Sequence, residues 1–418
     1  MNKIYTNSLW MITEKIFSIF GVIFVTAFVA KYIGPENFGK LAFSVSIFTI
    51  LQTFSMYGSE NIIFQKTSQN KIIGQKIIES TAIIRNFLYL TISIIIIIYT
   101  YLFLDYLTFV FSLATCISIY FSLNDVYTIY FNATLQSKIN TICNVTGLIV
   151  SLIIRYLIPL FQLSPEWLVI PIILVTLIPY IIRKSIFKKQ NLNLKINVIK
   201  YRKFMINIGN KLVLYTLSVA IFTKTSQIFL GAYSKYELGL FSVAMTLGTS
   251  FYFIFNALIT SIMTKIYQEN DINKNNNAIS QMYMVIFILS IAMYLFFNYF
   301  GKHIINMLYG SEYLEATKIL PLMVIVTMFS GLNTIAERYL YKFNAYDFLK
   351  KKTIALTIFN IICAYVLIYH YKIYGAVISM LITEIFSFTA FNYFYSKNTI
   401  FITQINFFKL KTYKRMLE

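Results

Sequence analysis

The sequence contains few charged residues, and acids are the scarcest of them. Charged side chains make up 12% of the 418 residues, whereas about 25% is typical of soluble domains. There are 16 acidic residues against 36 Lys and Arg, which gives a formal net charge of +20, and 58% of the residues are hydrophobic. This composition excludes a soluble globular protein and indicates a chain that crosses a membrane many times.

Signatures of enzymes and of metal sites are also missing. The three cysteines, Cys116, Cys143 and Cys363, show no CxxC spacing, and the only histidines are His303 and His370. The sequence contains no phosphate-binding glycine loop, no HExxH motif and no dinucleotide fingerprint. We therefore expect no metal, no cofactor and no catalytic residues.

Long hydrophobic runs take up most of the sequence. A helix needs about 20 residues to cross a hydrocarbon core of about 30 Å. About twelve runs meet this length, at residues 8–30, 41–65, 77–103, 106–130, 145–163, 168–187, 206–230, 238–264, 278–300, 317–341, 353–371 and 373–396. The expected fold is an all-α membrane protein with about twelve transmembrane helices.

The basic residues fall mainly in alternate connections between these runs. One side of the membrane receives about four Lys or Arg for each one on the other side. Because short basic loops are retained in the cytoplasm, both chain ends are predicted to be cytoplasmic. The first run lacks a cleavage site and is expected to remain as a helix. Topology and contact with membrane lipids thus account for the positive charge, and we expect no nucleic acid partner.

A basic stretch divides the runs into two groups of about six. Residues 183–203 contain eight Lys or Arg and no acid. The predicted organisation is an N-terminal six-helix lobe at 1–182, a basic cytoplasmic connector at 183–205, a C-terminal six-helix lobe at 206–396 and a basic cytoplasmic tail at 397–418.

A short internal repeat supports two related lobes. IGPENFGKLAFSVS, from Ile33, and YSKYELGLFSVA, from Tyr233, both follow the first helix of a predicted lobe. Six helices return the chain to the side on which it began, so the lobes would be pseudo-symmetric about an axis along the membrane normal, around a central cavity. In the connector, apolar side chains are predicted to dip into the inner leaflet, namely those of Leu192, Leu194, Ile196, Val198 and Ile199.

Several basic residues fall inside the predicted spans. They are Lys15, Arg85, Arg155, Lys211, Lys224 and Arg338. A cation at the centre of a membrane helix costs roughly 2.5–3.5 kcal/mol, so it usually faces the bundle interior or a water-filled cavity. Lys15, Lys211 and Arg338 lie near predicted helix ends, where their charge can instead reach the interface.

The run at 145–163 and the residues just before it carry a polar stripe. Asn140, Asn144, Gly147, Ser151, Arg155 and Gln162 fall within an arc of roughly 80° on a helix. The stripe either lines a cavity or packs against a neighbouring helix through small and amide side chains. An unpaired arginine in its centre favours the cavity.

Acids within the spans are few. Glu14 shares a helix face with Asn7 and Ser18, so it is either an ion-coupling residue, through proton binding or pairing with an intramembrane cation, or an interfacial acid. Glu337 is followed directly by Arg338, which permits a local ion pair.

Three stretches of the sequence look familiar when taken together. They are EKIFSIFGVIFVTAFVAKYIGPENFGKLAFS with YGSENIIFQK, then TKTSQIFLGAYSKYELGLFSVA, then NIICAYVLIYHYKIYGAVISMLITE. In their order and spacing they resemble the polysaccharide (O-antigen) flippases of the multidrug/oligosaccharidyl-lipid/polysaccharide exporter superfamily. The resemblance implies two six-helix lobes around a cationic cavity, in the bacterial inner membrane. It also implies that an undecaprenyl-diphosphate-linked oligosaccharide is moved across the membrane by alternating access, with a polymerase and glycosyltransferases as possible pathway partners.

The resemblance also bears on single residues. Lys224 matches a lysine that is frequent in the family, whereas Ser226 stands where the family often has an acid, so an ion-coupling role of that acid does not carry over. Arg155 and Arg85 are predicted to bind the diphosphate, since arginine can pair with it bidentately. Lys211 or Lys224 would contribute from the other lobe.

Amides and hydroxyls of the stripe, such as Asn144 and Ser151, are predicted to replace water around the sugar hydroxyls. Two other functions remain open. One is a multidrug or metabolite antiporter of the same superfamily, which would need acids for cationic drugs. The other is a polytopic polysaccharide polymerase, which would need a larger loop outside the membrane.

Overall fold

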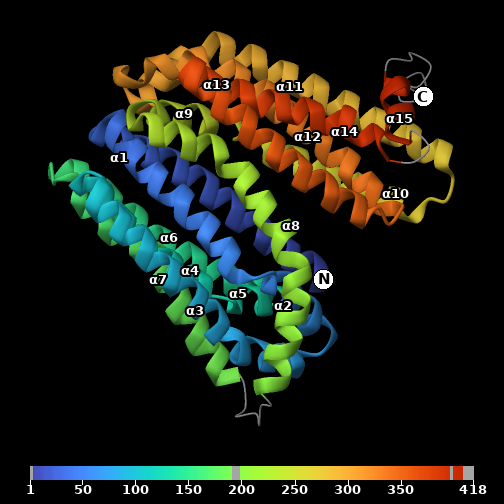
Figure 1. Ribbon diagram of the computed structural model, residues 1–418, viewed down its shortest axis with the longest axis horizontal. Helices are drawn as coiled ribbons and strands as arrows, with labels where there is room; N and C mark the ends of the chain where they lie inside the picture. The colour runs from blue at the N-terminus through green and yellow to red at the C-terminus, as the bar shows by residue number, and fades with distance from the viewer. Residues whose placement is uncertain (1–2, 191–197, 396–398, 408–418) are drawn as a thin grey trace. The chain divides into compact units, whose positions relative to one another are not determined.

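The computed structural model describes residues 3–190, 198–395 and 399–407, and it describes the α1 side chains from Ile23 on. All elements in these ranges are helical (Figure 1). The chain forms two compact units, Met1–Lys224 and Thr225–Glu418. The predicted all-α fold is confirmed.

Among the described residues, unit 1 contains seven α-helices, one short 3-10 helix and most of α8. They are α1 (Lys3–Met56), α2 (Ser59–Gln69), α3 (Lys71–Phe103), α4 (Tyr106–Asn124), α5 (Tyr127–Ala133), α6 (Ser137–Leu160), the 3-10 helix η1 (Pro165–Leu168), α7 (Val169–Gln190) and the larger part of α8 (Val198–Tyr233).

Unit 2 contains the end of α8 and the remaining helices. They are α9 (Lys235–Gly248), α10 (Tyr252–Gln268), α11 (Ile272–Tyr309), the 3-10 helix η2 (Ser311–Lys318), α12 (Leu320–Lys342), α13 (Tyr346–Phe388), α14 (Ala390–Tyr393) and α15 (Thr399–Phe407).

The two longest helices are each broken once. In α1 the break lies at Gly34, whose φ of 77° and ψ of 167° suit only glycine, and Pro35 begins the next segment. In α13 it lies at Lys372, with φ 52°. There the carboxylate of Glu237, at the start of α9, accepts a hydrogen bond of 2.8 Å from the backbone N–H of Ile373, which caps the second half of α13.

The number of membrane-crossing segments agrees with the sequence. Nine of the described helices are long and apolar enough to cross a membrane, and the pair α9 and α10, bent by 40°, makes a tenth. The breaks in α1 and α13 divide each of them into two helices. Counting these halves separately raises the number of candidate membrane-crossing segments from ten to twelve. The boundary predicted beside Asp105 is also present, because Asp105 caps the start of α4.

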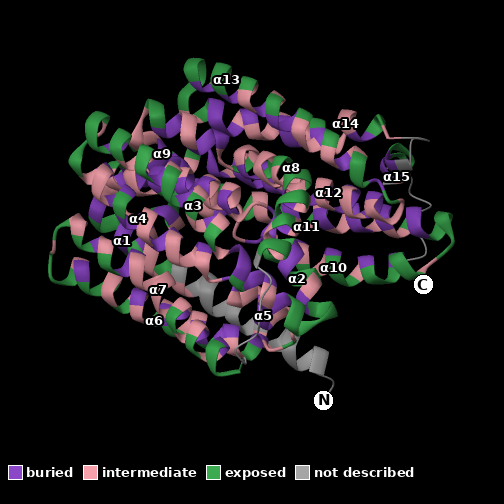
Figure 2. Ribbon diagram, turned by 60° about the horizontal axis from the view of Figure 1, so that its bottom comes forward, coloured by how far each residue is buried: buried purple, intermediate pink, exposed green. Residues whose placement is uncertain are grey.

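Helix packing in unit 1 brings α1, α4, α6 and α7 together. Two buried apolar clusters hold it, one around Phe131 and Phe187 and one around Phe48 and Tyr89. Figure 2 shows buried residues on the inward sides of the helices and exposed residues on their outer sides. Many exposed residues are large and apolar, including Ile95 and Phe103 of α3, as expected for a lipid-facing surface.

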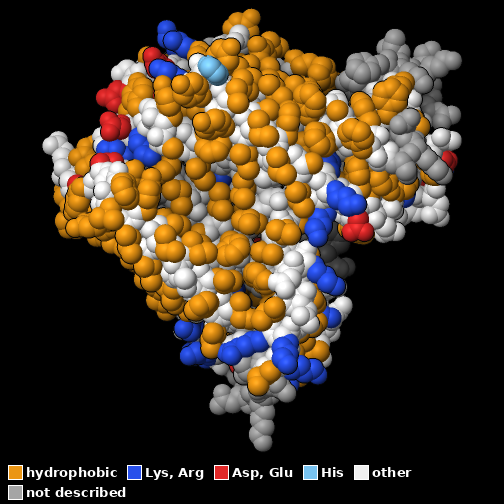
Figure 3. Space-filling view, viewed as in Figure 1, with side chains coloured by type: hydrophobic (Ala, Val, Ile, Leu, Met, Phe, Trp, Pro, Cys, Tyr) orange, Lys and Arg blue, Asp and Glu red, His pale blue; other side chains and the backbone are white. Residues whose placement is uncertain are grey.

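The surface view agrees with this placement (Figure 3). Hydrophobic side chains cover most of the visible face, and Lys and Arg gather at the end of unit 1 where α7 ends and α8 begins. Leu192, Leu194 and Ile196 of the predicted connector lie outside the described residues, as does 408–418 of the predicted tail. The rest of that tail includes α15, which packs on α11. The predicted domain boundaries stay predictions.

Candidate functional site

Unit 1 contains an open cavity of about 320 Å³ that combines polar and apolar residues. It lies between the second half of α1, the start of α2, the end of α4, α5, α6 and α7. Its lining consists of Gln52, Met56, Glu60, Ser122, Asp125, Val126, Thr128, Ile129, Asn144, Val175, Thr176, Pro179 and Arg183. Polar groups dominate this list, although the surrounding helices are strongly apolar.

A buried ion pair forms one wall of the cavity. Arg183 Nε donates to both carboxylate oxygens of Asp125, at 3.0 and 2.9 Å, and Nη2 makes a further short contact with Oδ2. The two side chains are 4% and 8% exposed. Arg183 Nη1 also donates to Oδ1 of Asn144 at 2.7 Å. Three elements are therefore joined by one guanidinium group whose charge is balanced by Asp125.

The chain geometry explains how these groups meet. Asp125 is the residue at which the backbone leaves α4, with φ −83° and ψ 45°, so its carboxylate lies at a helix end. Arg183 lies one turn after Pro179, inside α7. The sequence predicts Arg183 to be the first charge of the cytoplasmic connector, and this is wrong because α7 continues to Gln190 and buries it.

Some of the remaining polar groups of the lining have hydrogen-bond partners within the protein and others do not. Gln52 Nε2 donates to Ser122 Oγ at 2.9 Å, and the Thr176 hydroxyl lies 3.0 Å from that of Ser118. Glu60, in the first turn of α2, is exposed. Within the part of the chain that the structure describes, its carboxylate has no ion-pair or hydrogen-bond partner.

The predicted polar stripe on α6 is mainly a packing face. Asn140 Nδ2 donates to the carbonyl of Thr128 at 2.9 Å, and Ser151 donates to the carbonyl of Pro171 at 3.0 Å. A Cβ at Gly147 would lie 2.6 Å from the ring of Pro179, so α6 and α7 touch there. Of the stripe, only Asn144 lines the cavity.

The predicted cationic residues do not gather at the cavity. Arg155 is partly exposed, and its Nη1 lies 3.5 Å from Thr26 Oγ1. Arg85 is 2% exposed, and its Nη1 donates to Thr81 Oγ1 at 2.8 Å. Among the described residues, the Nε atoms of both arginines lack a hydrogen-bond partner.

The other predicted site residues lie elsewhere. Lys211 is exposed and Lys224 is partly buried, both on α8, and neither lines the cavity. The side chain of Glu14 is outside the described residues. The predicted binding roles of Arg155, Arg85, Lys211, Lys224, Asn144 and Ser151, and the ion-coupling role of Glu14, stay predictions.

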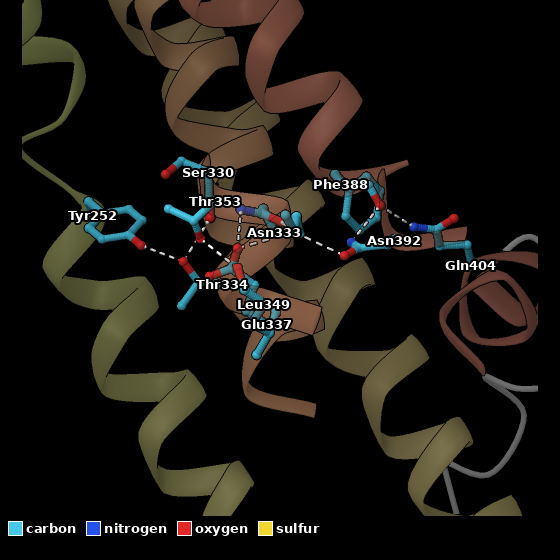
Figure 4. A network of polar contacts seen from close by, with 11 residues as sticks. Tyr252, Ser330, Asn333, Thr334, Glu337, Leu349, Thr353, Phe388, Asn392 and Gln404 are labelled. Carbon is cyan, nitrogen blue, oxygen red and sulfur yellow. Dashed lines mark hydrogen bonds and ion pairs between the residues drawn. The ribbon is translucent and has the colours of Figure 1, made fainter. Parts of the chain in front are cut away.

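Unit 2 contains a second buried polar cluster (Figure 4). Lys352, only 3% exposed, donates from Nζ to Asn333 Oδ1 at 2.9 Å, Glu337 Oε1 at 3.1 Å and Asn392 Oδ1 at 2.9 Å. These partners come from α12 and α14. A buried carboxylate oxygen of Glu384, Oε2, has no partner among the described residues.

This cluster corrects two expectations. Glu337 pairs with Lys352 and not with the adjacent Arg338, whose Nη1 donates to Thr260 Oγ1 at 2.8 Å. Lys352 falls in the basic connection between the predicted runs at 317–341 and 353–371, but it is buried in α13. Its two preceding neighbours, Lys350 and Lys351, look the same in sequence, so only the partners on other helices distinguish it.

Sequence comparison identifies the family. A family model described as polysaccharide biosynthesis protein matches residues 28–318 and 264–418. The chain belongs to this family of polysaccharide biosynthesis proteins. The resemblance inferred from the sequence is thus confirmed. The curated proteins contain no significant match to the chain.

Solved structures show the fold. A structure of lipid II flippase MurJ in an inward closed conformation matches with a TM-score of 0.73 and 16% identity, over 99% of this chain and 92% of that chain. An inward-facing multidrug resistance MATE family transporter of the MOP superfamily matches with a TM-score of 0.66 and 14% identity, over 92% and 96%.

A third match is a MOP superfamily transporter from Pyrococcus furiosus, with a TM-score of 0.56 and 12% identity, over 96% of each chain. At these identities the likeness concerns the fold, which is that of the two-lobe MOP transporters.

Proposed function

We propose that the protein is a flippase that moves an undecaprenyl-diphosphate-linked oligosaccharide, such as an O-antigen or capsule repeat unit, between the leaflets of the bacterial inner membrane by alternating access. Family membership supports a role in polysaccharide biosynthesis, and the fold supports transport over catalysis. In this proposal both chain ends are cytoplasmic, and the enzymes that build and polymerise the saccharide act before and after the flippase.

One observation carries the proposal. The cavity of unit 1 places amides, hydroxyls and a buried ion pair inside helices whose outer surfaces are apolar. A saccharide head group cannot cross hydrocarbon without replacing its water, because each unmatched polar group costs several kcal/mol. The cavity offers such replacement partners, while a polyprenyl tail can remain in the surrounding lipid.

The diphosphate requires cations, and we propose Arg155 as the main one. It is partly exposed, and its contact with Thr26 at 3.5 Å is long for a hydrogen bond. Arg85 is fully enclosed in this conformation, so it would act only after a rearrangement of unit 1. Lys211 and Lys224 are proposed to assist.

A second candidate, a cation antiporter, is favoured by the carboxylates of Glu60 and Asp125 in the cavity. Arg183 neutralises Asp125, however, and leaves one carboxylate to attract a cationic drug. Proteoliposomes separate the two functions, because an antiporter would drive efflux of a cationic dye and leave the lipid-linked saccharide in its original leaflet.

The test compares translocation by the natural chain and by Arg155→Ala. A fluorescent lipid-linked oligosaccharide in the proteoliposomes is bleached by an external quencher only when it reaches the outer leaflet. Loss of a charge-assisted contact should slow this by on the order of tenfold or more. Lys188→Ala, which removes an exposed charge on α7, serves as the control and should leave the rate unchanged. An unchanged rate in Arg155→Ala would remove Arg155 from the site.

A further inference from the structure

We propose that the cavity of unit 1 is a saccharide subsite that accepts neutral and amino-substituted sugar rings and rejects acidic ones, with Glu60 setting this preference. The inference rests on the proposed function, since it names the part of the substrate that the cavity receives. It adds a specificity that neither the family nor the fold assigns.

The size of the cavity fits one sugar ring and not a whole oligosaccharide. A volume of about 320 Å³ lies at the lower end of the range for ligand pockets, roughly 300–1,000 Å³. It would hold about ten water molecules at their liquid volume of about 30 Å³ each. A single ring can therefore replace most of this water.

The lining has the chemistry of a polyol site. Each sugar hydroxyl can donate one hydrogen bond and accept two, so it is matched by side chains that do both. Gln52, Asn144, Ser122, Thr128 and Thr176 supply amides and hydroxyls. They come from α1, α4, α5, α6 and α7, so they surround the space instead of lying on one wall.

The charge balance of the lining argues against an anion. Among the residues that the structure describes, Arg183 is the only Lys or Arg in the lining, and its guanidinium is bound to Asp125 and Asn144. An acidic sugar would thus lose the hydration of its carboxylate without gaining a free cation. It would also meet the carboxylate of Glu60, which no described residue neutralises.

The same carboxylate favours an amino sugar. An ammonium group placed beside Glu60 would form a charge-assisted hydrogen bond, which is roughly twice as strong as a neutral one. Neutral sugars would bind through the amides and hydroxyls alone. The cations proposed for the diphosphate, Arg155 and Arg85, do not line this space, so the saccharide and the diphosphate would be held at different places in unit 1.

The test uses three probes that share one polyprenyl diphosphate and differ only in a single sugar: N-acetylglucosamine, glucosamine or glucuronic acid. Binding to the purified full-length protein is measured at neutral pH. We expect the glucosamine probe to bind most tightly and the glucuronic acid probe about tenfold or more weakly than it. In Glu60→Gln this difference should shrink to a few-fold, and in Glu60→Lys the order should reverse.

Glu312→Gln is the matched control, because Glu312 is an exposed acid on η2, outside the lining, and it should keep the natural order. Equal binding of all three probes, or an order that Glu60→Gln and Glu60→Lys leave unchanged, would overturn the subsite. If the probes then still cross proteoliposome membranes, the proposed flippase function stands. Selective binding without translocation would overturn the flippase and keep the subsite, and absence of binding by any probe would overturn both.

Discussion

Two ion pairs involve buried cations that the sequence places beside connections between helices. Arg183 pairs with Asp125 in unit 1, and Lys352 pairs with Glu337 in unit 2. At single-residue scale the sequence predicted which cations fall inside hydrophobic runs, including Arg85 and Arg155. It missed these two pairs, because a basic residue near a helix end has the same sequence pattern whether it reaches the interface or turns inward to an acid on another helix.

Removing one partner of the ion pair in unit 1 should destabilise the protein strongly, whereas removing both partners should not. Replacing Arg183 with Met leaves the buried carboxylate of Asp125 without its partner, at an expected cost of about 3–5 kcal/mol. The double variant Arg183→Met with Asp125→Leu should recover most of this loss, because no charge remains buried. Thermal unfolding in detergent measures both variants. A double variant as unstable as the single one would show that the pair is not the cause.

In unit 2, the same substitution can be compared at the buried Lys352 and at its exposed neighbour Lys351. Lys352→Met removes three hydrogen bonds from Asn333, Glu337 and Asn392, and should lower the unfolding temperature clearly. Lys351→Met, at the adjacent exposed position, should change it little, since exposed charges contribute about 0–1 kcal/mol. Equal effects of the two substitutions would contradict the placement of Lys352.

At the scale of elements, hydrophobic runs predicted the helices well. The twelve predicted spans correspond to the described helices, including the boundary predicted beside Ile373, where α13 breaks at Lys372. The sequence did not reveal how the break is held, because Glu237 lies more than a hundred residues earlier in the chain. For the same reason the polar stripe on α6 left two interpretations open, and only its contacts with Thr128, Pro171 and Pro179 show that most of it packs between helices.

The cap at this break can be tested directly. Glu237→Ala leaves the N–H of Ile373 without its acceptor, and we expect a loss of about 1 kcal/mol in unfolding free energy. Glu312→Ala removes an exposed acid of the nearby 3-10 helix that has no ion-pair partner among the described residues, and should be neutral. Hydrogen exchange at the start of the second half of α13 gives the local measurement. Faster exchange there in Glu237→Ala alone is the expected result.

At the scale of the whole molecule, composition and charge placement predicted a multi-pass membrane protein with two lobes, and the fold confirms it. The sequence could not predict the cavity, because its lining is drawn from six helices and each contributes only one to four residues. Such a cavity gives the apolar bundle a place where a hydrated group can replace its hydrogen bonds to water with hydrogen bonds to the protein. The proposed function depends on that replacement.

The most direct test of this account blocks the cavity and leaves the rest of the molecule unchanged. Val175 lines the cavity on α7, whereas Ile181 on the same helix is 51% exposed on its outer side. We expect the Val175→Trp variant to stop translocating a fluorescent lipid-linked oligosaccharide in proteoliposomes. The Ile181→Trp variant should translocate it at the natural rate. Size-exclusion chromatography and thermal unfolding would verify that both variants are folded. Translocation at the natural rate by a folded Val175→Trp variant would contradict the account.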